Sequence, residues 1–193
     1  MRKSRTTSWR AYRPDAAGPQ RPPGGAACRI LGLDPGSRRT GYGILDIGEG
    51  RCTHVAHGCI DVSGLEFAVR LRTIFEAVQV LIDVHRPQEV AIERVFVSRN
   101  ADSALKLGQA RGAAIAAVSA GTPTFEYAPR EVKLAVVGYG AAAKGQVGHM
   151  IGRLLGIESR ISADAADALA VALCHSQARR LALLVRAVAG ARR

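Results

Sequence analysis

The strongest constraint on the fold is a change in hydrophobic period after residue 62. Three short apolar segments come first, at 29–34, 42–47 and about 52–62, separated by tight glycine-containing turns. Such segments are typical of an antiparallel meander. From Leu65 to Ile82, apolar residues recur at intervals of three and four, which predicts an amphipathic helix that ends before Pro87.

The rest of the chain alternates between the two periods. We expect a strand at 89–97, a helix at 100–120, a short strand at 124–127, helices at 129–137 and 144–155, and a long helix after Ser162. This order, β-β-β-α-β-α-β-α-α-α, predicts an α/β fold with a mixed five-stranded sheet flanked by helices.

Charge divides the chain into three parts. Lys and Arg number 27 against 16 Asp and Glu, and the formal net charge of +11 favours a polyanion as partner. Most of the excess lies outside the nearly neutral stretch 29–177. We expect a disordered basic arm at 1–28, one globular domain at 29–177, and a basic tail at 178–193 that ends the last helix and is then disordered. A transit peptide is an alternative interpretation of the arm.

The apolar pattern and the cysteines indicate a compartment. No apolar run approaches the roughly 20 residues of a bilayer-spanning helix, so we expect no membrane association. The four cysteines form no C-x-x-C pair, which favours reduced thiols in a cytoplasmic protein.

Four acidic residues occupy positions where a carboxylate is costly. Asp34 ends an apolar segment and Glu93 lies within another, and a buried carboxylate needs a partner or a metal. Asp164 and Asp167 share a face at the start of the last helix. A four-carboxylate cluster would be stabilised by hard cations. A turn residue (Asp34) or a helix-dipole partner (Asp164) is the structural alternative, and spacing alone leaves both open.

Several local sequences resemble the RuvC family of Holliday-junction resolvases. They are Leu-Gly-Leu-Asp-Pro-Gly-Ser (31–37), Thr-Gly-Tyr-Gly (40–43), Ala-Ile-Glu-Arg-Val-Phe (91–96), Asn-Ala-Asp-Ser-Ala-Leu-Lys-Leu-Gly-Gln-Ala-Arg-Gly (100–112) and Ala-Asp-Ala-Ala-Asp-Ala-Leu-Ala (163–170). The resemblance covers about 29–177 and implies an RNase H-like fold, in agreement with the element order.

The resemblance also implies a reaction. Asp34, Glu93, Asp164 and Asp167 would be catalytic and would hold two Mg²⁺ ions per subunit. Water would attack a phosphodiester of a four-way DNA junction in line, leaving a 5′-phosphate and a 3′-hydroxyl. The implied role is resolution of junctions by paired symmetric nicks in homologous recombination and DNA repair, with RuvA and RuvB as partners. Two matched nicks favour a C2 homodimer, for which the small-residue helix at 100–120 is a candidate contact.

Further positions are candidates for contact with DNA. Phe96 is either a core aromatic or, by the resemblance, a residue that stacks on junction bases. Lys133 and Lys144 match basic positions in the family's DNA-binding region. Arg99, Lys106 and Arg111 are additional phosphate candidates, with Arg99 and Lys106 on one helix face. Arg94 adds a cation beside the acids whose role stays open.

One cluster argues for a different chemistry. Cys52, His54, His57 and Cys59 look like a zinc box. On one continuous strand, however, Cys52 and His54 would face one way and His57 and Cys59 the other, and tetrahedral zinc needs convergent ligands.

Other functions remain open alongside junction resolution. One is an RNase H-like nuclease with another substrate, such as a ribosomal RNA precursor. Another is a junction-binding protein without cleavage. The Asp-x-Gly turn at 34–36 is also similar to that of sugar kinases and actin-like ATPases, which need a second domain for which we expect no room in this chain.

Overall fold

Five strands form one mixed sheet in the computed structural model, which describes residues 28–48, 50–94, 100–118, 121–140 and 144–190. The elements are β1 (Cys28–Asp34), β2 (Arg39–Gly48), β3 (Arg51–Asp61), α1 (Phe67–His85), β4 (Glu89–Glu93), α2 (Ala101–Ala116), β5 (Thr124–Tyr127), α3 (Pro129–Val137), α4 (Lys144–Leu155) and α5 (Ala163–Gly190). The strand order is β3-β2-β1-β4-β5. The first three strands pair antiparallel, while β4 and β5 add parallel to β1.

This architecture confirms the predicted α/β class and element order, and the fold is RNase H-like. Pro129 opens α3, and Gly156 follows α4 with a positive φ of 64°. The side-chain oxygen of Ser162 accepts a hydrogen bond from the Ala165 N–H at 3.3 Å, which satisfies one of the free donors at the start of α5. The basic arm predicted for 1–28 falls almost entirely outside the described residues.

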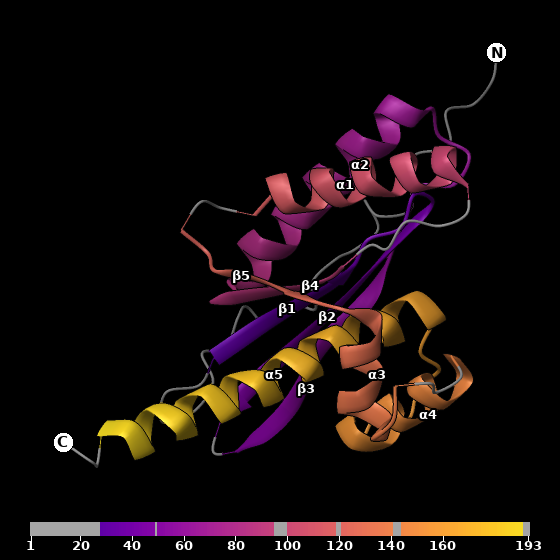
Figure 1. Ribbon diagram of the computed structural model, residues 1–193. Helices are drawn as coiled ribbons and strands as arrows, with labels where there is room; N and C mark the ends of the chain where they lie inside the picture. The colour runs from indigo at the N-terminus through magenta and orange to yellow at the C-terminus, as the bar shows by residue number, and fades with distance from the viewer. Residues whose placement is uncertain (1–27, 49, 95–99, 119–120, 141–143, 191–193) are drawn as a thin grey trace.

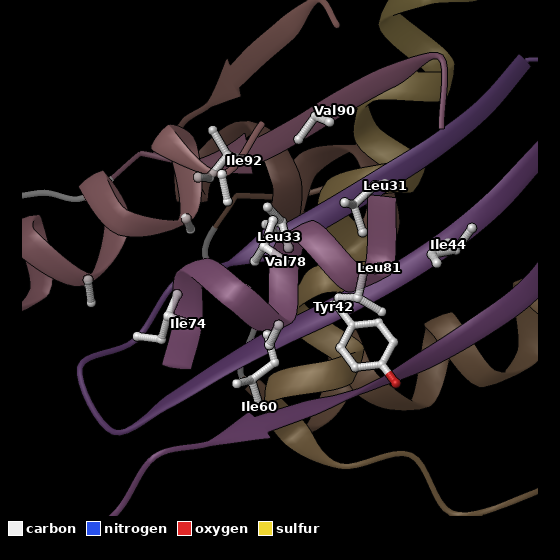
Figure 2. Close-up of a cluster of buried hydrophobic side chains, with 14 of the residues drawn as sticks. Leu31, Leu33, Tyr42, Ile44, Ile60, Ile74, Val78, Leu81, Val90 and Ile92 are labelled. Carbon is white, nitrogen blue, oxygen red and sulfur yellow. The ribbon is translucent and has the colours of Figure 1, made fainter. Parts of the chain in front are cut away.

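The helices cover the two faces of the sheet. Figure 1 shows α1 and α2 on one side and α3, α4 and α5 on the other. Two cores result. The core under α1 and α2 holds large aliphatic side chains from every central strand, among them Leu33, Ile44 and Ile92 (Figure 2). The core on the other face is built around the buried residues 169–174 of α5.

The two halves of α5 have different surroundings. Residues 165–176 are almost all buried, whereas almost all of 177–190 is exposed. Among the described helices, α5 alone has the length and apolar character to cross a membrane, and half of its most apolar stretch is buried within the protein. That burial is what the core helix of a globular domain requires.

A polar network anchors α5 to the parallel strands. The Tyr127 hydroxyl lies 2.7 Å from His175 Nδ1, and His175 Nε2 lies 2.7 Å from the Glu89 carboxylate. Arg179 donates to the same carboxylate at 3.1 Å. Burial lowers the pKa of His175. A neutral imidazole that accepts from Tyr127 and donates to Glu89 satisfies both ring nitrogens in this network.

Candidate active site

Asp34 and Glu93 lie at the ends of two neighbouring parallel strands. β1 and β4 run in register with Leu33 opposite Ile92, so the next residue on each strand is one of the two acids. Leu33 and Ile92 belong to the core under α1 and α2. Because side chains alternate along a strand, Asp34 and Glu93 both face α5. The register therefore puts two carboxylates side by side at the end of the sheet.

Glycine on β2 lets α5 come close to Asp34. Gly41 is the register partner of Asp34, and a Cβ built on Gly41 would overlap the main-chain carbonyl of Asp164. Gly32 and Gly43 meet Ala168 and Leu169 of α5 in the same way. The first turn of α5 therefore touches the strand that pairs with Asp34, which a side chain at any of these glycines would prevent.

Asp164 and Asp167 lie on that first turn. Asp164 Oδ2 accepts a weak hydrogen bond from Cys59 Sγ of β3 at 3.7 Å. Burial, reinforced by the nearby Asp164 carboxylate, raises the pKa of Cys59 to about 12, so this thiol stays protonated as a donor. Asp167 lines a cavity of about 630 Å³ between α4 and α5. All four predicted acids are thus partly buried at one end of one face of the sheet.

The acids fit a hard divalent cation in the chemistry of their oxygen atoms. Carboxylate oxygens are the ligands that Mg²⁺ takes in proteins. Within the described part of the chain, however, no three His, Cys, Asp or Glu side chains are grouped closely enough to hold a metal ion. The fold therefore brings the four carboxylates to one region of the protein, but not close enough together to form a complete set of metal ligands.

The cavity beside Asp167 was not evident in the sequence. Its α4 wall carries Gly145, Gly148, Gly152 and, just after the helix, Gly156, together with His149 and Arg153. The glycines recur at intervals of three and four, which places them on one helix face. This glycine spacing was the sequence signal that could have predicted the cavity, because a helix face without side chains leaves its backbone accessible.

The predicted DNA contacts have mixed positions. Lys106 on α2 is exposed and its Nζ lies 2.6 Å from Asp102. Arg111 is largely buried, donates to the Glu93 carbonyl at 3.3 Å and pairs with Glu126 at 2.6 Å, so it also braces the end of β4. Lys133 is partly buried on α3, and Lys144 is the first residue of α4. Phe96 and Arg99 lie outside the described residues.

Arg94 has a contact within the sheet. Its Nε lies 3.8 Å from the Glu126 carboxylate of β5, and its main-chain N–H donates to the Tyr127 carbonyl at 2.8 Å. The structure therefore gives Arg94 a role as the ion-pair partner of Glu126.

The predicted separation of the Cys–His cluster is wrong. The pairing of β2 and β3 shifts between Ile44 and Leu45, where β3 carries one extra residue. This bulge reverses the alternation, so Cys52, His54, His57 and Cys59 all face α5. His57 Nδ1 lies 2.8 Å from His54 Nε2, while Cys52 contacts Ser176 at 3.2 Å and Cys59 contacts Asp164. The two cysteines contact opposite ends of the buried part of α5, so the four side chains are spread along the strand.

Comparison with known proteins identifies the family. Residues 30–175 match the family described as crossover junction endodeoxyribonuclease RuvC. A relative of that description from Methylococcus capsulatus is 57% identical over 148 residues, covering 76% of this chain and 89% of the relative. The one from Chromohalobacter salexigens is 53% identical over 156 residues, covering 80% and 84%.

Solved structures give the same result. The structure of Thermus thermophilus RuvC in complex with Holliday junction substrate has a TM-score of 0.74 and 33% identity, over 80% of this chain and 96% of that chain. The yeast mitochondrial Holliday junction resolvase Ydc2 shares the fold, with a TM-score of 0.57, 13% identity, and coverage of 77% and 79%. The chain therefore belongs to the RuvC family of crossover junction endodeoxyribonucleases and is an enzyme.

Proposed function

We propose that this chain is a Mg²⁺-dependent endonuclease that resolves four-way DNA junctions by paired symmetric nicks in homologous recombination and DNA repair. The observation that supports the proposal most is the register of β1 and β4, in which Leu33 lies opposite Ile92 and the two acids Asp34 and Glu93 follow them. The Thermus thermophilus relative, solved with a Holliday junction, supports the choice of substrate.

The four acids divide the work by position. Asp34 and Glu93 extend from rigid strand ends and would hold the ions between the sheet and α5. Asp164 and Asp167 would complete the set from the first turn of α5, with Asp167 open to the adjoining cavity. Two bound Mg²⁺ ions supply a lowered pKa for the attacking water and charge stabilisation at the leaving 3′ oxygen. The products would carry a 5′-phosphate and a 3′-hydroxyl.

The remaining assignments follow from the same proposal. Phe96 would stack on junction bases, and Arg99, Lys106, Arg111, Lys133 and Lys144 would contact phosphates. A C2 homodimer would place one active site on each of two opposed strands. RuvA and RuvB would be partners, the protein would act in the cytoplasm, residues 29–177 would form the nuclease domain, and residues 178–193 would form a basic tail.

A cleavage assay with three substrates tests the proposal. The protein is incubated with a synthetic four-way junction, a linear duplex and a folded RNA, each with and without Mg²⁺. We expect symmetric paired nicks in the junction alone and only with Mg²⁺. Junction binding without nicks would support a non-cleaving junction protein, and cleavage of RNA alone would support another RNase H-like nuclease.

Substitution of Asp34 tests the site. Asp34→Asn removes one carboxylate charge with little change in volume, so it should keep junction binding and abolish nicking. Asp46→Asn is the matched control, because Asp46 is an acid at the opposite end of the β1–β2 pair, bonded to Arg29. Wild-type nicking by the Asp34→Asn variant would remove Asp34 from the site.

A further inference from the structure

A second cavity opens on the α1 and α2 face of the sheet, at the same end as the acids. It measures about 630 Å³ and is lined from three separate segments: the turn after β1, the start of α1 and the start of α2. Its basic side chains are Arg38, Arg70 and Lys106, one from each segment. Residues so distant in the chain meet here only because of the fold.

The cavity is built to receive an anion. Arg70 is partly buried, and its Nε donates to the Leu65 carbonyl at 2.7 Å. This hydrogen bond fixes the guanidinium at the cavity wall. The two terminal nitrogens of the guanidinium are further donors. Lys106 is held 2.6 Å from Asp102. Arg38 is exposed at the rim, and Ser37 and Ser103 add hydroxyl groups.

The acids in this wall do not cancel its charge. Glu66 and Asp102 line the cavity along with the three cations, and Asp102 is already bonded to Lys106. The cavity also adjoins the first turns of α1 and α2, whose helix dipoles add positive potential. The balance favours a group of one or two negative charges.

Its position relates it to the proposed active site. Ser37 follows Asp34 by three residues, so their main chains are at most about 11 Å apart. Any phosphodiester cut near Asp34 belongs to a strand whose neighbouring phosphates lie within that range. An anion site whose wall includes Ser37 is therefore placed to hold the same strand, or the strand beside it.

We infer that the cavity lined by Arg38, Arg70 and Lys106 binds a backbone phosphate of the junction close to the phosphate that is cut. This inference rests on the proposed function. It joins Lys106, already a candidate for phosphate contact, to Arg38 and Arg70, which neither the motifs nor the comparisons assign, in one site. The cavity contributes affinity and alignment of the strand, while the acids on the opposite face carry out hydrolysis.

Salt-dependent binding tests the inference. A fluorescent four-way junction is titrated with protein in EDTA, so that no strand is cut, from 50 to 300 mM KCl. The double variant Arg38→Gln, Lys106→Gln should bind about tenfold more weakly at 100 mM KCl. The slope of log affinity against log salt should fall by about 1 for each phosphate that the variant no longer neutralises.

Two control variants separate the cavity from general charge. Arg51→Gln removes an exposed cation at the start of β3, at the other end of the β2–β3 pair, and should bind like the wild type. Arg38→Lys with Lys106→Arg keeps both charges and should retain most of the affinity. Because Arg38 and Lys106 are exposed, the thermal midpoint of the Gln variants should match that of the wild type.

A phosphate scan locates the binding position. Junctions that carry one methylphosphonate each, stepped along the strand on both sides of the cut, remove single phosphate charges. At one position near the cut the wild type should bind about tenfold more weakly, and the double Gln variant should show no further decrease. With Mg²⁺, the same variant should show a raised KM and an unchanged kcat.

The outcomes distinguish the two proposals. If the wild type binds no junction, the proposed function fails and the inference fails with it. If the wild type binds and cuts the junction while the double Gln variant keeps the same affinity, salt slope and scan, the inference alone is wrong. An equal decrease in the Arg51→Gln variant would also overturn it, since the effect would then be general charge.

Discussion

The two faces of the sheet differ in the size of the side chains that they bury. The face under α1 and α2 is filled with large aliphatic side chains, and Figure 2 shows them interleaved between α1 and the strands. The face under α5 is lined at the acid end by glycine, so that helix backbone lies directly on strand backbone. The first face gains stability from buried volume, whereas the second gives up that volume to bring Asp34, Glu93 and the start of α5 together.

Truncating a side chain on the aliphatic face should have the largest effect on stability. Ile44 is fully buried on β2, three residues from Gly41. Ile44→Ala should lower the free energy of unfolding by about 2–5 kcal/mol, because it removes buried apolar surface and leaves a cavity. Urea unfolding measures this change, and junction nicking per folded molecule should stay near the wild-type rate. A decrease below about 1 kcal/mol would contradict the importance of this core.

Filling the glycine face should affect activity more than stability. Gly41→Ala places a methyl group against the Asp164 carbonyl and should move the first turn of α5, at a cost of about 1–3 kcal/mol. A displacement of about 1 Å at reacting groups lowers rates roughly 100-fold, so nicking should fall at least that far.

A glycine without close neighbours provides the control. Gly121 lies in the turn before β5, and a Cβ there would meet nothing within 4 Å among the described residues, so Gly121→Ala should leave nicking intact and change stability by less than about 1 kcal/mol. If Gly41→Ala nicks junctions as fast as Gly121→Ala, the close approach of α5 is not needed for the site.

Acid should weaken the packing of the α5 face, because three buried or half-buried histidines lie there. Burial lowers the pKa of His54, His57 and His175. In the unfolded chain a histidine has a pKa of about 6.5. Below that pH the unfolded chain therefore binds protons that the folded chain excludes. Their contribution to stability is therefore complete above about pH 6.5 and is lost as the pH falls, by up to about 1.4 kcal/mol per pH unit for each histidine.

Glu89 adds to the same trend at lower pH. Burial alone would raise its pKa, but the hydrogen bonds from His175 and Arg179 outweigh burial and lower it. Its stabilising contribution is therefore present above the unfolded pKa of a glutamate and is lost as the pH falls through the lower folded value. The free energy of unfolding, measured with urea between pH 8 and pH 5, reports the contribution of the histidines. The same measurement at lower pH reports the contribution of Glu89. His175→Gln should flatten the upper part of the curve, and an unchanged curve would show that this histidine is not excluded from protonation.

The smallest effect should come from the bare face of α4. Gly148 lies inside this helix, and a Cβ there would make only an ordinary 3.7 Å contact with Ala166. Gly148→Ala should raise the free energy of unfolding by up to about 1 kcal/mol. Since Gly148 lines the cavity beside Asp167, the same variant should raise KM for the junction. A stability gain with unchanged KM would mean that the substrate does not enter this cavity.

Local sequence patterns were sufficient to predict the helices and strands, but they did not predict which face of the sheet part of β3 presents its side chains to. Pro129, Ser162 and Gly156 act through their own backbone or cap chemistry, so their roles could be predicted from neighbouring residues alone. The bulge in β3 depends on how β3 pairs with β2, and no residue within 52–59 signals it. That single extra residue reversed the predicted faces of His57 and Cys59.

The sequence by itself determined the element order, the family, and the acids worth testing, because periodicity, caps and short motifs are properties of adjacent residues. Only the tertiary structure decided which side chains meet. The register of β1 with β4 aligned Asp34 with Glu93, glycine contacts set the distance of α5, and packing of three separate segments created the basic cavity. Contacts between distant segments depend on how whole surfaces fit together, and a linear pattern does not record that fit.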